Sequence, residues 1–307
     1  MKNTVARLVR YFTEGIGAYT TGTMIGIEVE TQFVDRSGLP ISIDTAKKIF
    51  HLFHSDTRYG EWVVTAKRNK MITELTSLWR NDRMLYELGR HNIELSFSPK
   101  HKNVAVDEAQ RGLWILEENA NACGAYPFFG PIIDSDENLL VVPDERDAAW
   151  LALDGPEALN LLARTSSVQF TVDVRPEDAI YVLNTLGENV EAFLSDYPQD
   201  ALWKRYISSS HAGYRSDRYG GPLLFGNIED YCARLAEHAI VVGNTLISHE
   251  ETSSFNIPLF IRSVWWHFRL KRYGEKLCVE IRPCARKKDS SIKDQFSFVR
   301  RILSPLI

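Results

Sequence analysis

Two glutamates stand two residues apart in a stretch where polar and apolar residues alternate. The stretch Gly-Ile-Glu-Val-Glu contains them as Glu28 and Glu30. On an extended strand, alternate side chains point to the same face, so the two carboxylates would lie about 7 Å apart. Hard oxygen ligands at this spacing suit Mg²⁺ or Mn²⁺, which in turn bridge phosphate oxygens. The pair therefore indicates phosphoryl-transfer chemistry.

Such a pair is common on solvated strands, and four further stretches strengthen the interpretation. Period-two alternation also occurs in residues 92–98, 167–174, 263–272 and 277–282. Their polar faces carry Glu94, Gln169, His267, Arg269, Glu280 and Arg282. The alternative is that these polar faces are simply exposed to solvent. However, carboxylates gathered on one surface repel one another unless cations are bound. We expect these faces to line one concave functional surface.

The C-terminal part of the chain is basic. Residues 262–301 contain 12 Lys and Arg against four acidic residues. Guanidinium groups suit phosphate oxygens, so we expect this stretch to supply the cations that bind a nucleotide triphosphate. The alternative is a basic surface that is exposed to solvent. The chain has no Walker A and no GxGxxG motif, which excludes a P-loop or Rossmann site, and it has no GxSxG or HExxH motif.

Composition narrows the class of protein further. The 307 residues carry a net charge of −4, with 25% charged and 44% hydrophobic residues, as in folded globular proteins and unlike nucleic-acid binders. No apolar run is long enough for a membrane span, and the N-terminus lacks the apolar stretch of a signal peptide. The four cysteines form no CxxC pair, which predicts reduced, mostly buried thiols and no structural zinc, with a regulatory disulfide as the alternative. We expect a cytoplasmic protein.

Helices and strands must position the polar faces. Helical periodicity predicts helices over residues 5–12, 106–121, 156–162, 176–186 and 228–242. Asn227 is a suitable N-cap for the last of these. Strands with one apolar and one polar face are typical of an antiparallel sheet that covers a core on one side. No linker or repeat interrupts the chain, so we expect one domain over residues 1–307.

The motifs that carry these residues follow one another in a specific order. They are Gly-x-Glu-x-Glu from residue 26, Ile-Glu-Leu-Ser-x-x-Pro from 93, Leu-x-Arg-Thr-x-x-Val-Gln-Phe-x-Val-Asp from 162, Phe-Arg-Leu-Lys-Arg-Tyr from 268 and Val-Glu-Ile-Arg from 279. In this order they resemble glutamate–cysteine ligase of the plant and proteobacterial type, among the carboxylate–amine ligases.

The resemblance implies an α+β fold, the glutamine synthetase-like catalytic domain, in which a curved antiparallel sheet has helices on its outer face. It also implies ATP- and Mg-dependent ligation, with Mn as an alternative metal. The glutamate side-chain carboxylate becomes an acyl phosphate, and an amine, cysteine in this family, displaces the phosphate. This reaction belongs to glutathione biosynthesis, and its partners are small molecules.

The resemblance also assigns roles to individual residues. It implies that the metal ligands are Glu28, Glu30, Glu94, Gln169 and Glu280. It implies that the phosphates are bound by Arg269, Lys271 and Arg282, of which Arg269 and Arg282 are the catalytic candidates. The candidates for substrate binding are Arg164, Gln169, Arg205 and Arg215. The chain departs from the family at His267, which stands where an acidic residue is expected.

Three functions remain open at this point. The first is the γ-glutamyl ligase, whose acceptor is cysteine or another amino acid or amine. The second is a kinase-like relative that transfers phosphate and forms no amide. The third is a non-catalytic descendant that binds a nucleotide or a partner protein, against which the retained carboxylates argue. The sequence leaves the oligomeric state open.

Overall fold

The computed structural model describes residues 2–141, 145–249 and 255–304. Its strands are β1 Met24–Val34, β2 Trp62–Arg68, β3 Met71–Ser77, β4 Arg83–Tyr86, β5 Asn92–His101, β6 Tyr126–Phe128, β7 Ser167–Asp173, β8 Tyr219–Gly220, β9 Ile240–Val242, β10 Thr245–Ile247, β11 Trp265–Trp266, β12 Phe268–Tyr273 and β13 Lys276–Ala285. Its helices are α1 Lys2–Thr13, α2 Ile43–Ser55, α3 Ala105–Ala122, α4 Glu145–Asp154, α5 Pro156–Ala163, α6 Ala179–Glu188, α7 Val190–Leu194, α8 Gln199–Ser209, α9 Ile228–Leu235, α10 Ile257–Arg262 and α11 Ser291–Ile302. The fold is α+β, as predicted.

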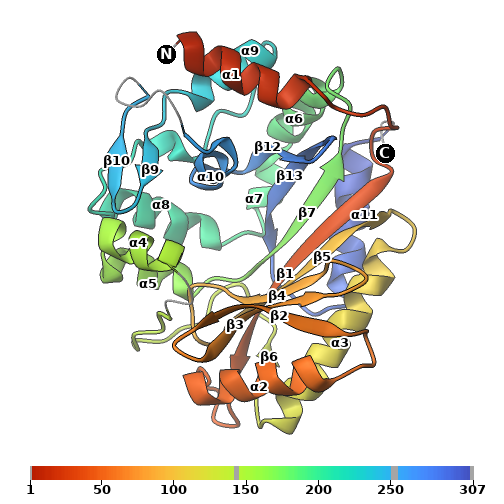
Figure 1. Ribbon diagram of the computed structural model, residues 1–307, viewed down its shortest axis with the longest axis vertical. Coiled ribbons are helices and arrows are strands. Elements are labelled where there is room, and N and C mark those ends of the chain that lie inside the picture. Colours follow the sequence, from red (N-terminus) through yellow and green to blue (C-terminus); the bar gives the residue numbers. More distant parts are fainter. Residues whose placement is uncertain (1, 142–144, 250–254, 305–307) are drawn as a thin grey trace.

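A large antiparallel sheet forms the centre of the molecule (Figure 1). Its strands follow the order β12-β13-β7-β1-β5-β4-β3-β2, and β6 pairs with the end of β1. The five strands that carry the predicted polar faces, β12, β13, β7, β1 and β5, are therefore consecutive neighbours in it. This adjacency turns five separate sequence stretches into one continuous polar surface.

The apolar faces of these strands form the main core. Ile27, Leu95, Phe170 and Ile281 are all at most 1% exposed. Helices α2, α3, α6 and α11 cover this side of the sheet, as the predicted arrangement requires (Figure 1). Alternation therefore identified the buried face correctly, because burial of every second side chain is what creates the pattern.

A second group of helices lies on the other side. Helices α4, α5 and α8 pack together around their own apolar cluster, which includes Leu159, Leu162 and Tyr206. In Figure 1 they stand to the left of β7, whereas α3 and α11 stand to its right. The prediction of helices on the outer face thus describes one of two helical groups.

Three predicted elements were wrong in their extent. The helix expected over residues 228–242 ends at Leu235, and its last residues form β9 instead. β9 and β10 are a hairpin around Gly243, which has φ +59°, because a β-branched run before a Gly-Asn turn favours a hairpin. Asn227 does cap the shorter helix, accepting a hydrogen bond from the Asp230 backbone N–H at 2.8 Å.

The strand expected over residues 263–272 is divided at His267. Its first part, β11, pairs in parallel with β8, and its second part, β12, pairs with β13. The chain changes partner between them, so one stretch of alternation serves two sheets. The helix expected over 176–186 begins later, at Ala179, because residues 176–178 form a turn before it.

Two simpler expectations concern the cysteines and the membrane. All four cysteines are free, and Cys232, Cys278 and Cys284 are buried. Over the described ranges, the helices lack the combination of length and apolar character that a bilayer crossing needs.

Candidate active site

The polar face of the sheet borders a cavity of about 710 Å³. Its lining from the sheet includes all the predicted metal and phosphate residues: Glu28, Glu30, Glu94, Gln169, Arg269, Lys271, Glu280 and Arg282. A cavity of this size suits a small-molecule ligand. The predicted concave surface is therefore present.

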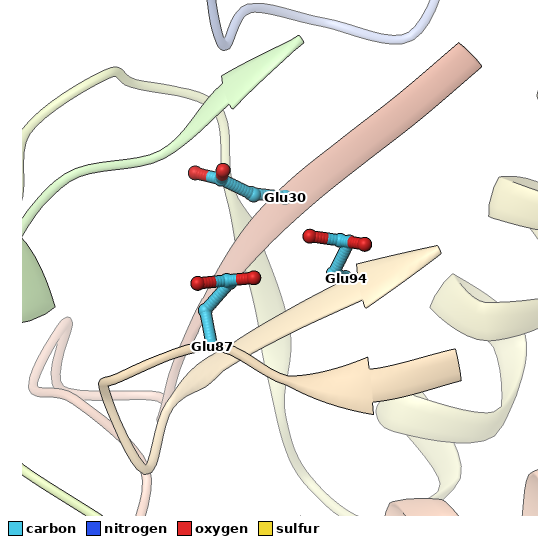
Figure 2. Close-up of side chains that lie close together, drawn as sticks. All are labelled: Glu30, Glu87 and Glu94. Carbon is cyan, nitrogen blue, oxygen red and sulfur yellow. The ribbon is translucent and has the colours of Figure 1, made fainter. Parts of the chain in front are cut away.

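Three carboxylates converge at one end of this cavity. Carboxylate oxygens of Glu30, Glu87 and Glu94, here called the carboxylate trio, lie within 4.8 Å of one another. Glu30 and Glu94 are direct cross-strand partners on β1 and β5, and Glu87 follows the end of β4 (Figure 2). Register and a strand end thus bring together residues that are 64 positions apart in the most distant case, from 30 to 94.

The trio is chemically suited to a hard divalent cation. Glu30 and Glu94 are buried, and Figure 2 shows that the three side chains lie close together. Burial and the charge of Glu94 raise the pKa of Glu30 to about 7, against hydrogen bonds from the N–H and hydroxyl of Ser167 at 2.8 and 3.0 Å. Clustered oxygen ligands of this kind are those that Mg²⁺ and Mn²⁺ prefer.

A group of cations surrounds Glu280 farther along the same face. Arg269, Lys271 and Arg282, here called the cation group, all form ion pairs with this carboxylate. Burial alone would raise the pKa of Glu280, but the three cations, Arg269 above all, hold it well below its usual range. Glu280 is therefore an ionised carboxylate that organises the cations.

The three cations differ in how accessible they are to a ligand in the cavity. The Arg269 guanidinium donates to the backbone oxygens of Ile261 and Val264 at 2.9 and 2.7 Å, and its side chain is 5% exposed. The side chains of Lys271 and Arg282 are 16% and 17% exposed. Lys271 and Arg282 are thus better placed than Arg269 to contact phosphate.

Gln169 connects the trio with the cation group, and Glu28 adds a further carboxylate beside Lys271. The Gln169 amide accepts a hydrogen bond from Arg282 at 2.9 Å and donates one to Glu30 at 3.2 Å. Glu28 lies 3.6 Å from the Lys271 ammonium, and burial raises its pKa, although Lys271 opposes that rise. The site is thus one connected network with an acidic end and a basic end.

Three predicted substrate-binding residues do not line the cavity. Arg215 is exposed and pairs with Asp217 and Glu237, at 2.9 and 2.8 Å. Arg205 is exposed on α8. Arg164 ends α5 and lies 3.9 Å from Asp136. Sequence order placed these residues near the polar strands, but the path of the chain turns their side chains elsewhere.

Sequence reasoning missed Glu87. The short strand β4 buries Met84 and Tyr86, so Arg83, Leu85 and Glu87 follow one another on the cavity side. This is the same period-two signal that identified the other strands, but four residues of strand are too few to stand out. Arg83 also lines the cavity and makes two hydrogen bonds to Glu74, at 3.1 and 2.9 Å.

Comparisons with known proteins return distant structural likenesses. No protein-family model and no curated protein sequence matches the chain. The chain is similar to the glutamate–cysteine ligase of Francisella tularensis, solved in complex with AMP, at 11% identity and a TM-score of 0.48. It is also similar to a structure described as a novel glutamine synthase homologue, at 13% identity and a TM-score of 0.41. A third similar structure is Plasmodium falciparum glutamine synthetase, at 10% identity and a TM-score of 0.44.

These alignments differ in how much of each protein they include. They cover 86%, 98% and 97% of this chain but 61%, 58% and 53% of the three solved chains. The chain therefore spans somewhat more than half the length of those proteins. Likenesses at such identities and TM-scores do not assign the chain to a family, so its function is inferred from the site itself.

Proposed function

We propose that this protein is an ATP- and Mg-dependent ligase that joins the side-chain carboxylate of glutamate to an amine. One observation carries the proposal: a carboxylate trio and a cation group share one cavity and are connected through Gln169. An acidic end that suits metal ions beside a basic end that suits phosphates is what nucleotide-dependent phosphoryl transfer requires. The ordered motifs favour cysteine as the acceptor amine.

The trio supplies the proposed metal ligands. Glu30, Glu87 and Glu94 would hold Mg²⁺, and Glu28 is a further ligand on the same strand face as Glu30. The bound ion would neutralise charge on the phosphates. Glu280, ion-paired with all three members of the cation group, is assigned to holding those cations in place.

The reaction places distinct demands on the chain's own residues. A carboxylate oxygen of glutamate attacks the γ-phosphorus of ATP, and ADP leaves. The amine nitrogen then attacks the acyl carbon, phosphate leaves, and the nitrogen loses a proton. We assign Lys271 and Arg282 to binding the phosphate oxygens, because they are the more exposed cations, and Arg269 to positioning Glu280. Fixed charges of this kind stabilise the charge that develops during transfer.

The first experiment measures ADP release from ATP and Mg²⁺ with glutamate across a panel of amines that includes cysteine. Release that requires both glutamate and one amine, with the amide detected by mass spectrometry, supports the ligase. A stable phosphorylated product without an amide would instead show the kinase-like alternative. Absence of Mg-dependent nucleotide binding by calorimetry would show a non-catalytic protein.

A substitution tests the trio directly. Glu94→Gln keeps the size of the side chain but removes one of the charges, so we expect at least a 100-fold loss of ADP release, or about 3 kcal/mol of transition-state stabilisation. Glu118→Gln, on the exposed side of α3, is the matched control and should retain full activity. Near-normal turnover of Glu94→Gln would contradict the metal assignment.

A further inference from the structure

The cavity has one wall that the proposed phosphoryl transfer does not use. The sheet lines the cavity from one side, and α4, α5 and α8 line it from the other (Figure 1). The lining residues of α4, α5, α8 and β11 are all apolar or aromatic: Ala149, Trp150, Leu159, Leu162, Trp203, Tyr206 and Trp265. The cavity therefore has a charged half and a hydrocarbon half.

Four rings form a contiguous surface on this second half. Trp265 lies at the centre, with ring centroids 5.3 Å from Trp150, 5.7 Å from Trp203 and 5.5 Å from Tyr206. We call these four residues the aromatic wall. The three tryptophans are only partly buried in the structure, so they keep ring surface that a ligand can cover.

The wall is held rigidly from behind. Trp203 stacks on Tyr219 with centroids 5.2 Å apart and an interplanar angle of 4°, and the Arg218 guanidinium lies 5.7 Å from the Trp265 ring. The hydroxyl of Tyr206 donates a hydrogen bond to the buried Asp154 at 3.0 Å. Rings fixed before binding lose little conformational entropy when a ligand arrives.

The polar atoms of the wall favour a hydrocarbon ligand over a nucleotide base. The hydroxyl of Tyr206 donates its proton to Asp154, so it is not available as a donor to a ligand in the cavity. The indole N–H groups of Trp150, Trp203 and Trp265 are donors, so they match the ring nitrogens of a purine but not the amino group of adenine, which needs an acceptor when it is buried. An alkyl or phenyl group needs no such partner. Stacked and edge-to-face ring contacts suit an aromatic ligand best.

The wall also adjoins the acidic end of the site. Helix α5 leads through Thr165 into Ser167, whose N–H donates to Glu30 at 2.8 Å. Leu88, directly after Glu87, packs against the same apolar cluster as the wall. An amine whose body rests on the wall can therefore direct its nitrogen toward this end of the cavity.

We propose that the aromatic wall binds the body of the acceptor amine and that this amine carries an aromatic ring. The inference rests on the proposed ligase and names its second substrate class. It departs from cysteine, whose side chain is too small to cover four rings.

Phenethylamine and ethanolamine are the probes, since they share an aminoethyl group and differ in the ring. We expect kcat/KM for phenethylamine to exceed that for ethanolamine at least tenfold. Trp203→Ala should lower the phenethylamine value at least tenfold and the ethanolamine value less than threefold, with KM for ATP unchanged. Trp150→Ala, in the middle of α4, is a second variant in case Trp203→Ala does not fold. Trp79→Ala is the matched control, because Trp79 is 82% exposed in a turn and does not line the cavity.

Two results would overturn the inference. One is an equal preference for the two amines. The other is a rise in KM for ATP in Trp203→Ala with every amine, which would place the nucleotide base on the wall.

Calorimetric titration with phenethylamine, without ATP, separates the inference from the proposed function. If the natural protein binds phenethylamine and Trp203→Ala does not, the aromatic wall is supported as the amine-binding surface, even where no amide forms. Turnover of cysteine without binding of phenethylamine would leave the ligase intact and refute the wall.

Discussion

Identical side chains have opposite electrostatic roles in this site. Glu30 lies beside another carboxylate, and burial raises its pKa to about 7, whereas three cations keep the pKa of Glu280 well below its usual range. The difference comes from the neighbours, since both residues are glutamates on adjacent parts of one sheet face. Charge type alone therefore does not assign a metal ligand, and the ion pairs of Glu280 favour a positioning role.

A buried histidine gives a prediction at the same scale. His91 is 0% exposed, and within the described part of the chain neither ring nitrogen has a hydrogen-bond partner. Burial, followed by the charge of Arg90, lowers its pKa to about 3. The unfolded chain binds this proton near pH 6.5, so stability is complete above that pH and falls as the pH drops toward 3. Protonation of His91 in the unfolded chain should lower the free energy of unfolding by roughly 2–3 kcal/mol between pH 7 and 4.5.

His91→Leu tests this effect, because leucine cannot take up a proton. We expect the free energy of unfolding, measured with urea at several pH values, to depend less steeply on pH between 6.5 and 4.5. His51→Leu, on the exposed side of α2, should keep the original slope. An unchanged slope in His91→Leu would show that this histidine does not titrate on unfolding.

At the scale of elements, close backbone contacts attach the loop before α9 to α6. The Asn184 side chain makes two hydrogen bonds to the Phe225 backbone, both 2.8 Å long. One turn later, Gly187 allows the Leu223 carbonyl to approach, and a Cβ on this glycine would lie 1.9 Å from that oxygen. The helix thus holds the loop through the Asn184 side chain and through close approach of the loop backbone to Gly187.

Gly187→Ala should therefore destabilise the protein. Alanine in place of an exposed helical glycine usually stabilises by about 1 kcal/mol, but here the clash with backbone should cost about 1–3 kcal/mol. The free energy of unfolding in urea measures the loss. Glu188→Ala, exposed at the next position, should stay within about 0.5 kcal/mol of the natural protein. A more stable Gly187→Ala would mean that the loop can move away freely.

At the scale of the whole molecule, the site lies between two separately packed regions. The main core joins the sheet to α2, α3, α6 and α11, and a smaller apolar cluster joins α4, α5 and α8. The cavity is lined from both. A ligand that contacts both sides should stabilise their arrangement, since binding to the folded state alone raises stability.

Nucleotide binding should therefore raise the midpoint of thermal unfolding. With Mg–ATP at 100 times its Kd, the gain is about 3 kcal/mol, which corresponds to about 5 °C for a chain of this size. Chelation of Mg²⁺ with EDTA should remove the shift, and so should Glu94→Gln, whereas Glu118→Gln should keep it. A shift of the same size in EDTA would contradict the role of the trio as metal ligands.

The sequence by itself was sufficient for the strands that carry the site. Alternation in β1, β5, β7 and β13 records which side chains enter the apolar core, because the core selects apolar residues at every second position. The polar residues between them line the cavity, even in β7, where all seven residues are buried. Alternation therefore predicted the polar faces and the eight metal and phosphate candidates that line the cavity. The α+β fold followed from the resemblance that those motifs carry.

Only the tertiary structure decided which of these residues meet. Glu87 joins Glu30 and Glu94 through the register of β4, β1 and β5, and no local pattern encodes the pairing of distant strands. Arg164, Arg205 and Arg215 point away for the same reason, and the strand expected over 263–272 divides because its pairing partner changes. The aromatic wall likewise consists of rings from three separate segments. Local periodicity reports burial, whereas contacts between distant segments depend on how the whole chain packs.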